Sequence, residues 1–200
     1  MKLMTLLLPV MLGVETVAPN SASIVLSGGT SDGEPGGIPP GSFDLGFYED
    51  AFVAQGSYSG IRVTFKTQDQ GADHHALTLF IPSHGDFSVG YASSRGEHTS
   101  RIPEAPFTFR AEQSAGVKDR FGRPRPMKVE FAHWRQVAEQ SWLHSYVEFT
   151  DCEIQVESMF IEAHKLTFSG GFVCRSKQPA LSATGRFAVN AGKLGVSKVD

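Results

Sequence analysis

The chain has 200 residues, a net charge of -3 at neutral pH and a hydrophobic fraction of 40%. This length suits one well-packed domain and is short for two, and the composition excludes wholesale disorder and a multispanning membrane protein. The small net charge argues against a polyanionic or polycationic partner, so a nucleic-acid partner is not expected.

The first 23 residues have the features of a secretory signal peptide. Lys2 precedes an apolar run from Leu3 to Val14, and small residues at 21–23 offer a cleavage site. This run of 12 residues is too short to cross a bilayer as a helix, so no transmembrane segment is expected. Export predicts a secreted, periplasmic or cell-surface location. The alternative is an N-terminal apolar strand or helix that packs on the domain.

The next segment, residues 24–42, is predicted to be a flexible linker. From Gly28 to Gly41 it is dense in glycine and proline and has one large apolar side chain, so burial cannot offset the entropy of ordering it. A single β domain is therefore expected to span residues 43–200.

Within that domain, apolar and polar residues alternate in short runs, as they do in half-buried antiparallel strands. A helix of two turns at most is expected at Arg135–Trp142, and Ser83 to Gly85 are expected to turn a hairpin between two strands. Abundant phenylalanine, glycine and proline agree with an all-β fold, an antiparallel β-sandwich or jelly-roll-like domain, with a closed β-barrel as second choice. Strands are expected near 60–67, 76–82, 86–92, 107–109, 127–134, 147–149, 152–156, 166–174 and 181–189.

Two of these runs share a pattern. Ser169–Cys174 and Thr184–Val189 both read as small hydroxyl, glycine, any residue, phenylalanine, any residue, apolar. Neighbouring strands with this pattern would pair and place Phe172 and Phe187 on one face. Glycines within strands often mark a close approach of another backbone. We expect this at Gly170, Gly171 and Gly185.

The two cysteines lie in phase with the buried side chains of their strands. Cys152 is in phase with Ile154, and Cys174 with Phe172, so both sulfurs should face the same apolar layer. Two unpaired buried thiols are the alternative. An exported chain favours the disulfide, which in the chain-entropy model would contribute roughly 3 kcal/mol.

Histidines gather in and around the expected hairpin. His74, His75, His84 and His98 are candidate ligands for zinc or copper, since imidazole suits both metals. Their spacing matches no strong metal-binding signature, and polar residues in exposed turns are the favoured interpretation. No other cofactor is expected.

A basic run from Lys118 to Lys128 contains five basic residues and one acid. It could bind phosphate or a polyanion, or dock on an acidic protein partner. Trp134 and Trp142 could form a sugar-binding platform, although aromatic residues beside a sheet more often pack in the core or at its rim. The candidate binding residues of the basic run are Arg120, Phe121, Arg123 and Arg125.

The chain has no Gly-x-Ser-x-Gly motif, and cysteines in strand phase are poor nucleophiles. The sequence therefore favours an exported, non-catalytic binding or structural module that uses its surface loops, with a protein or glycan partner. Two alternatives stay open: a metal-dependent hydrolase built on the histidines, and a subunit of a larger assembly. The oligomeric state is not predicted.

Overall fold

The structure, a computed structural model, describes residues 17–28, 37–56, 59–67, 73–92, 97–139, 141–176 and 181–199. About three quarters of them lie in β-strands, and a short 3-10 helix, η1, spans Ala111–Ser114. The strands are β1 Ser21–Gly28, β2 Gly41–Leu45, β3 Phe47–Gly56, β4 Gly60–Lys66, β5 Asp73–Pro82, β6 Ser88–Ala92, β7 Glu97–Arg101, β8 Phe107–Arg110, β9 Lys128–Ala138, β10 Ser141–Phe149, β11 Asp151–Glu162, β12 Lys165–Ser176 and β13 Leu181–Val199.

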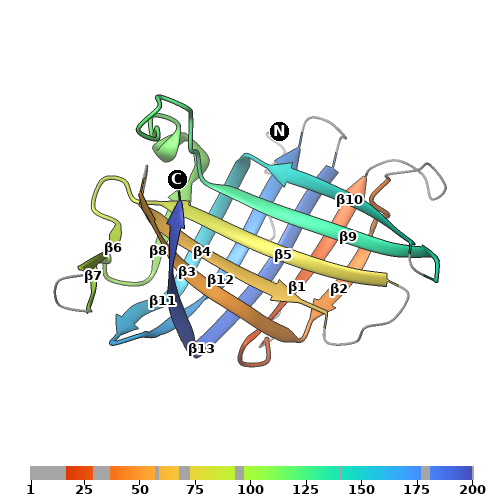
Figure 1. Cartoon of the computed structure of the whole chain (residues 1–200), viewed down its shortest axis with the longest axis horizontal. Coiled ribbons are helices and arrows are strands. Elements are labelled where there is room, and N and C mark those ends of the chain that lie inside the picture. The colour runs from red at the N-terminus through yellow and green to blue at the C-terminus, as the bar shows by residue number, and fades with distance from the viewer. Residues whose placement is uncertain are drawn as a thin grey trace, which may run out of the picture.

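Eleven strands form one mixed sheet in the order β10-β9-β5-β4-β3-β13-β12-β11-β8, with β1 beside β13 and β2 beside β1. The sheet is so strongly curled that its two halves face each other, and their strands cross in projection (Figure 1). Half A contains β2, β1, β12, β11 and β8. Half B contains β3, β4, β5, β9 and β10. The small hairpin β6-β7 forms a separate two-stranded sheet that contacts β3 and β4 of half B.

Strand β13 joins the halves because it changes partners along its length. Its first part pairs antiparallel with β12 and β1, whereas Leu194–Val199 pairs parallel with β3. Between these parts the strand bends at Ala191, whose φ is 51°. The Tyr48 hydroxyl donates a hydrogen bond to the Lys193 carbonyl and so holds the bend from half B. Burial raises the pKa of this phenol, which keeps the donor protonated.

The core fills the space between the halves. Phe187 from the first part of β13 packs on Phe65 from half B with ring centroids 6.5 Å apart, and on Phe168 from half A at 4.5 Å. All three rings are fully buried. The all-β, sandwich-like fold class expected from the sequence is confirmed. A closed barrel would require β10 to pair with β8 or β2, the other ends of the branched sheet, and the described residues of β10 pair only with β9.

Three expectations about local structure are wrong. Arg135–Trp142 is not helical but forms the far end of the β9-β10 hairpin. Both faces of the hairpin are exposed there, and Val137 is 60% exposed. Apolar and polar residues therefore do not alternate in this part of the strand. The strands on either side of Ser83–Gly85 do not pair as a hairpin, since β5 pairs with β4 and β9, and β6 with β7.

The third concerns the start of the domain. The sheet begins at Ser21 rather than at residue 43, because Ala22, Ile24 and Leu26 are buried and β1 lies between β2 and β13. Cleavage after Ser23 would remove the first three residues of this strand. Residues 1–16 and 29–36, which hold the apolar run and the middle of the expected linker, lie outside the described residues.

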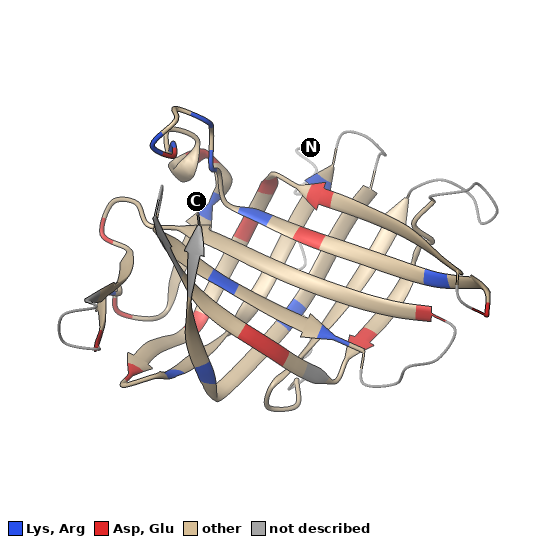
Figure 2. Cartoon of the chain, in the orientation of Figure 1, with Lys and Arg blue, Asp and Glu red and all other residues tan. Residues whose placement is uncertain are grey.

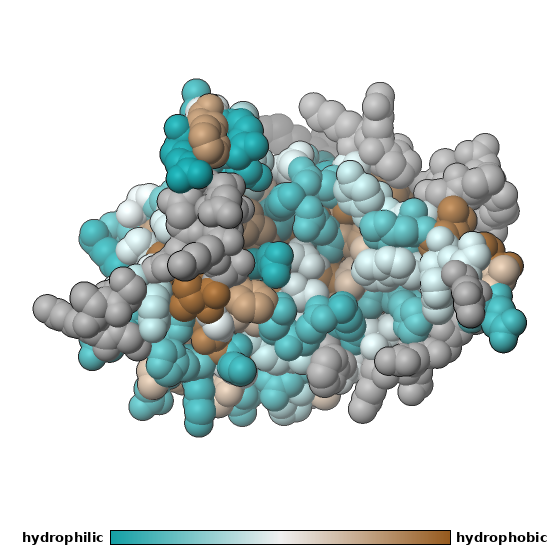
Figure 3. All heavy atoms as spheres, in the orientation of Figure 1, coloured by the Kyte–Doolittle hydropathy of each residue, from teal (hydrophilic) through white to brown (hydrophobic). Residues whose placement is uncertain are grey.

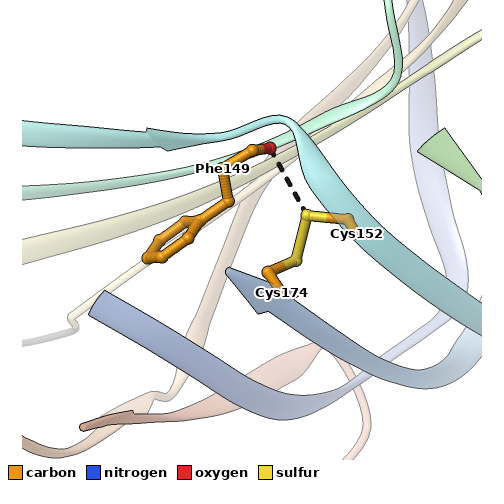
Figure 4. Close-up of a disulfide and its surroundings, with 3 residues drawn as sticks. All are labelled: Phe149, Cys152 and Cys174. Atoms are coloured by element: carbon orange, nitrogen blue, oxygen red, sulfur yellow. Dashed lines mark hydrogen bonds between the residues drawn. A yellow bond between two sulfur atoms is a disulfide. The ribbon is translucent and has the colours of Figure 1, made fainter. Parts of the chain in front are cut away.

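A disulfide joins Cys152 to Cys174, as expected (Figure 4). The two residues are directly opposite each other on β11 and β12, and both side chains are buried. The Cys152 sulfur also lies 3.3 Å from the carbonyl oxygen of Phe149, the last residue of β10. A disulfide sulfur carries no proton, so this is a close contact and not a hydrogen bond. It places the disulfide where β10 of half B passes into β11 of half A.

The matching patterns of β12 and β13 are also confirmed as a strand pair, with Phe172 opposite Gly185 and Gly170 opposite Phe187. The glycines lie where backbones approach closely. A Cβ on Gly170 would collide with the carbonyl oxygen of Gln155 on β11, and one on Gly185 would collide with that of Ser23 on β1.

We predict that Gly170→Ala lowers the free energy of unfolding by about 1 to 3 kcal/mol, because the backbone of β11 has to move to admit the methyl group. Urea denaturation measures this. Gly116→Ala is the matched control, since a Cβ there meets nothing within 4 Å. Equal stability of the two variants would show that β11 yields without cost.

We also predict that the double variant Cys152→Ala/Cys174→Ala lowers the free energy of unfolding by about 3 kcal/mol, since the disulfide closes a loop between residues 22 apart in sequence. The measurement is chemical denaturation beside the wild type. Titration of the unfolded wild type without reductant should find no free thiol. One or two reactive thiols there would contradict the disulfide.

Candidate binding loop

The most elaborate non-strand feature is the segment between β8 and β9. It begins with η1 and continues through residues 115–127, which project from the rim of the sheet (Figure 1). Ser114, fully buried, fastens the ends of the segment. Its hydroxyl donates to the Ala111 carbonyl at 3.0 Å and accepts a hydrogen bond from the Met127 amide at 2.7 Å. We call residues 117–126 the binding loop.

Asp119 organises the binding loop from within. Its Oδ1 accepts hydrogen bonds from the backbone amides of Phe121 and Arg123 at 2.9 and 3.0 Å. Its Oδ2 accepts from Arg123 Nε at 2.7 Å and from Arg125 Nη2 at 3.1 Å. The side chain of Asp119 is fully buried under these donors. Both carboxylate oxygens are therefore satisfied by groups of the loop itself.

These donors also fix the charge of Asp119. Burial alone would raise the pKa of the carboxyl, but the hydrogen bonds from Arg123, Phe121 and Arg125 outweigh it and lower the pKa to about 2. The carboxylate is therefore ionised at neutral pH. It neutralises one of the four cationic side chains between Lys118 and Arg125, and the loop keeps an excess of positive charge (Figure 2).

The outer side of the loop combines an apolar ring with cations. Phe121 is 61% exposed, and the guanidinium carbons of Arg120 and Arg123 lie 4.6 and 5.0 Å from its ring centroid. Gly122, with φ 78°, turns the chain beneath the ring. In Figure 3 the loop is a hydrophilic projection with one apolar patch. The arrangement is a small, preorganised surface of one aromatic ring and several cations.

The four binding residues named from the sequence, Arg120, Phe121, Arg123 and Arg125, thus lie together around one carboxylate. Sequence reasoning missed Asp119 and counted it only as a charge. A signal was present, because an aspartate often accepts a hydrogen bond from the amide two residues later and so begins a turn. That amide belongs to Phe121.

The four histidines named as metal ligands do not come together. His74 and His75 begin β5, whereas His84 lies past the other end of this strand, roughly 30 Å away at 3.3 Å per residue, and His98 lies on β7. Among the described residues, no group of three or more His, Cys, Asp and Glu side chains is placed to hold a metal ion. Each histidine instead contacts an aromatic ring: Trp142 for His74, His133 for His75, Phe109 for His84 and Tyr91 for His98.

His75 and His133 form a stacked pair directly across β5 and β9, with ring centroids 4.8 Å apart. Phe43 of β2 lies against His75 at 4.5 Å and closes this end of the core. His133 is buried, and its Nε2 lies 3.5 Å from an Asp73 carboxylate oxygen. Burial lowers the pKa of His75 to about 4, assisted by His133 and His74 and opposed by Asp73. The pair is a structural element between the halves.

The outer face of half B carries a row of rings that was only partly anticipated. Trp134 of β9 lies directly opposite His74 of β5 and His144 of β10. Trp134 and His144 stack with centroids 4.8 Å apart, and Tyr146 continues this stack at 6.1 Å. Tyr146 is 66% exposed and Trp142 is 42% exposed. Because stacked rings cover one another's faces, the row offers edges rather than a flat sugar-binding platform.

In the part of the chain that the structure describes, no helix has the length and apolar character needed to cross a bilayer. The sequence matches no protein-family model, and no curated protein or solved structure proves similar to it.

The depressed pKa of His75 predicts a loss of stability in mild acid. Unfolded His75 binds a proton near its ordinary pKa of 6.5, but the folded protein admits it only near pH 4. The contribution of neutral His75 is therefore complete above pH 6.5 and declines as pH falls towards 4, by roughly 1 kcal/mol for a half-buried ring. Urea denaturation from pH 7 to 4 measures this, and in His75→Phe the decline should shrink. An unchanged decline would assign it to other groups.

Proposed function

We propose that this chain is an exported, non-catalytic binding module whose binding loop docks on an acidic surface of a protein partner. The observation that carries the proposal is the tip of the loop, where the exposed Phe121 ring lies between the guanidinium groups of Arg120 and Arg123. Aromatic and arginine side chains dominate the binding energy of protein interfaces, and cations select acidic partners.

Preorganisation supports this role. A flexible arginine-rich loop would lose conformational entropy on binding, about 0.5 to 1.5 kcal/mol for each side chain that becomes fixed. Here Asp119 already holds Arg123 and Arg125, and Ser114 already holds the ends of the segment. The tip of the binding loop contributes little to the core, because every residue from 120 to 124 is exposed. These residues are therefore accessible to a partner.

An acidic protein surface fits the loop better than a nucleic acid does. Single-stranded nucleic acids stack their bases on free aromatic faces along an extended basic groove. The Phe121 ring instead has two guanidinium groups lying on it, and the whole chain is slightly acidic. Export is the part of the proposal supported by the disulfide and by the apolar N-terminal run.

Binding of the full-length chain to fluorescent poly-L-glutamate, followed by anisotropy over a range of salt concentrations, tests the proposal. We expect affinity to fall as salt rises, and Phe121→Ala and Arg120→Ala each to weaken binding at least tenfold, about 1.4 kcal/mol. Arg62→Ala is the matched control, because Arg62 also lies over a phenylalanine, Phe52, at 5.3 Å, but belongs to β4 and not to the loop.

Asp119→Asn separates a built site from simple charge attraction. The variant makes the chain more positive by one unit, so nonspecific attraction would strengthen binding. If the ordered loop is what binds, losing the carboxylate that holds Arg123 and Arg125 should weaken it instead. Binding only to phosphatidylserine vesicles or to an oligonucleotide, or no effect of the loop variants, would overturn the acidic-protein proposal.

A further inference from the structure

Strand β10 lies at one end of the large sheet. Across the described part of the chain it pairs only with β9, so one edge of its nine residues has no strand beside it. The opposite end of the sheet differs, since β8 has only four residues and runs directly into η1. A long strand edge exposes a row of backbone donors and acceptors that another strand can satisfy.

Natural proteins usually protect such an edge with lysine or proline, and β10 contains neither. Its one charged residue, Glu148, is ion-paired with Lys128 at 2.7 Å. Its exposed side chains are instead aromatic, with Tyr146 66% and Trp142 42% exposed beside the free edge. Such rings stabilise a sheet most when a neighbouring strand places another ring opposite them.

We infer that β10 pairs antiparallel with β10 of a second copy of this chain, which joins the two sheets across a two-fold axis. The register that pairs all nine residues is centred on Ser145. It places His144 opposite Tyr146 of the second copy on the outer face. On the inner face it places Leu143 opposite Val147 of the second copy.

The pairing is self-complementary, as a two-fold interface requires. On the outer side His144 faces Tyr146, and Glu148 falls opposite Trp142 rather than opposite a second glutamate. On the inner side Leu143 faces Val147 and the small Ser145 faces its own copy at the axis. The row of rings that runs from His74 through Trp134 to His144 continues onto Tyr146 of the second copy. A strand from an unrelated protein would meet these requirements only by chance, whereas a second copy meets them by symmetry.

Sedimentation velocity of the full-length chain over a wide concentration range tests the inference. The wild type should show a reversible monomer–dimer equilibrium. Two double variants test the register: His144→Glu/Tyr146→Glu, and His144→Lys/Tyr146→Lys. Each places like charges opposite one another across the axis and should weaken the dimer at least tenfold. An equimolar mixture of the two should recover dimers, because acidic side chains then face basic ones.

Phe160→Glu is the control, because Phe160 is 51% exposed near the end of β11 that lies farthest from the disulfide and from Phe149 of β10. It should leave the equilibrium unchanged. A cooperative thermal unfolding transition confirms that each variant is folded. If a double variant does not fold, the single variant Tyr146→Lys replaces it in the test. A wild type that stays monomeric up to about 1 mM, dimers insensitive to the variants, or a mixture that fails to recover would each overturn the inference.

Discussion

The structure depends on one strand that belongs to both halves of the sheet. Because β13 pairs antiparallel with β12 and then parallel with β3, the hydrogen-bond network of half A continues into half B. The bend that permits this places Ala191 in the left-handed region, which costs about 1 to 2 kcal/mol for a residue other than glycine. Side chains compensate: Asn20 accepts a hydrogen bond from the Asn190 amide, and Tyr48 donates to the Lys193 carbonyl. The curled sheet and its enclosed core follow from this bend.

The sequence predicted the strands wherever one face is buried and the other exposed. From residue 60 onward alternation located almost every strand, and the shared glycine pattern located the β12-β13 pair, because both are local properties of a pleated chain. It did not locate β1, β2, β3 or β7, and it assigned a helix to Arg135–Trp142. At β1 the apolar residues adjoin a run typical of a signal peptide, and at Arg135–Trp142 the hairpin end has no buried face. The change of partner within β13 leaves no local pattern at all.

The candidate site was predictable in its composition but not in its construction. A dense run of arginines identified Arg120, Phe121, Arg123 and Arg125, yet the role of Asp119 depends on a turn that brings amides and guanidinium groups to one carboxylate. The histidines that cluster in the sequence, in contrast, do not form one cluster in space. A strand carries its residues apart by 3.3 Å each, so neighbours in the chain such as His75 and His84 reach opposite ends of the sheet.

The two proposed contact surfaces are connected through β9. Only Met127 separates the binding loop from the start of β9, and β9 pairs along its length with β10, whose free edge is proposed to meet a second copy. A two-fold dimer would therefore carry two binding loops in a fixed relation. For a partner with repeated acidic sites, the second contact would then be intramolecular, so two loops of modest affinity could bind far more tightly than one. Such a module would use its curled sheet to fix the spacing and its loops to recognise charge.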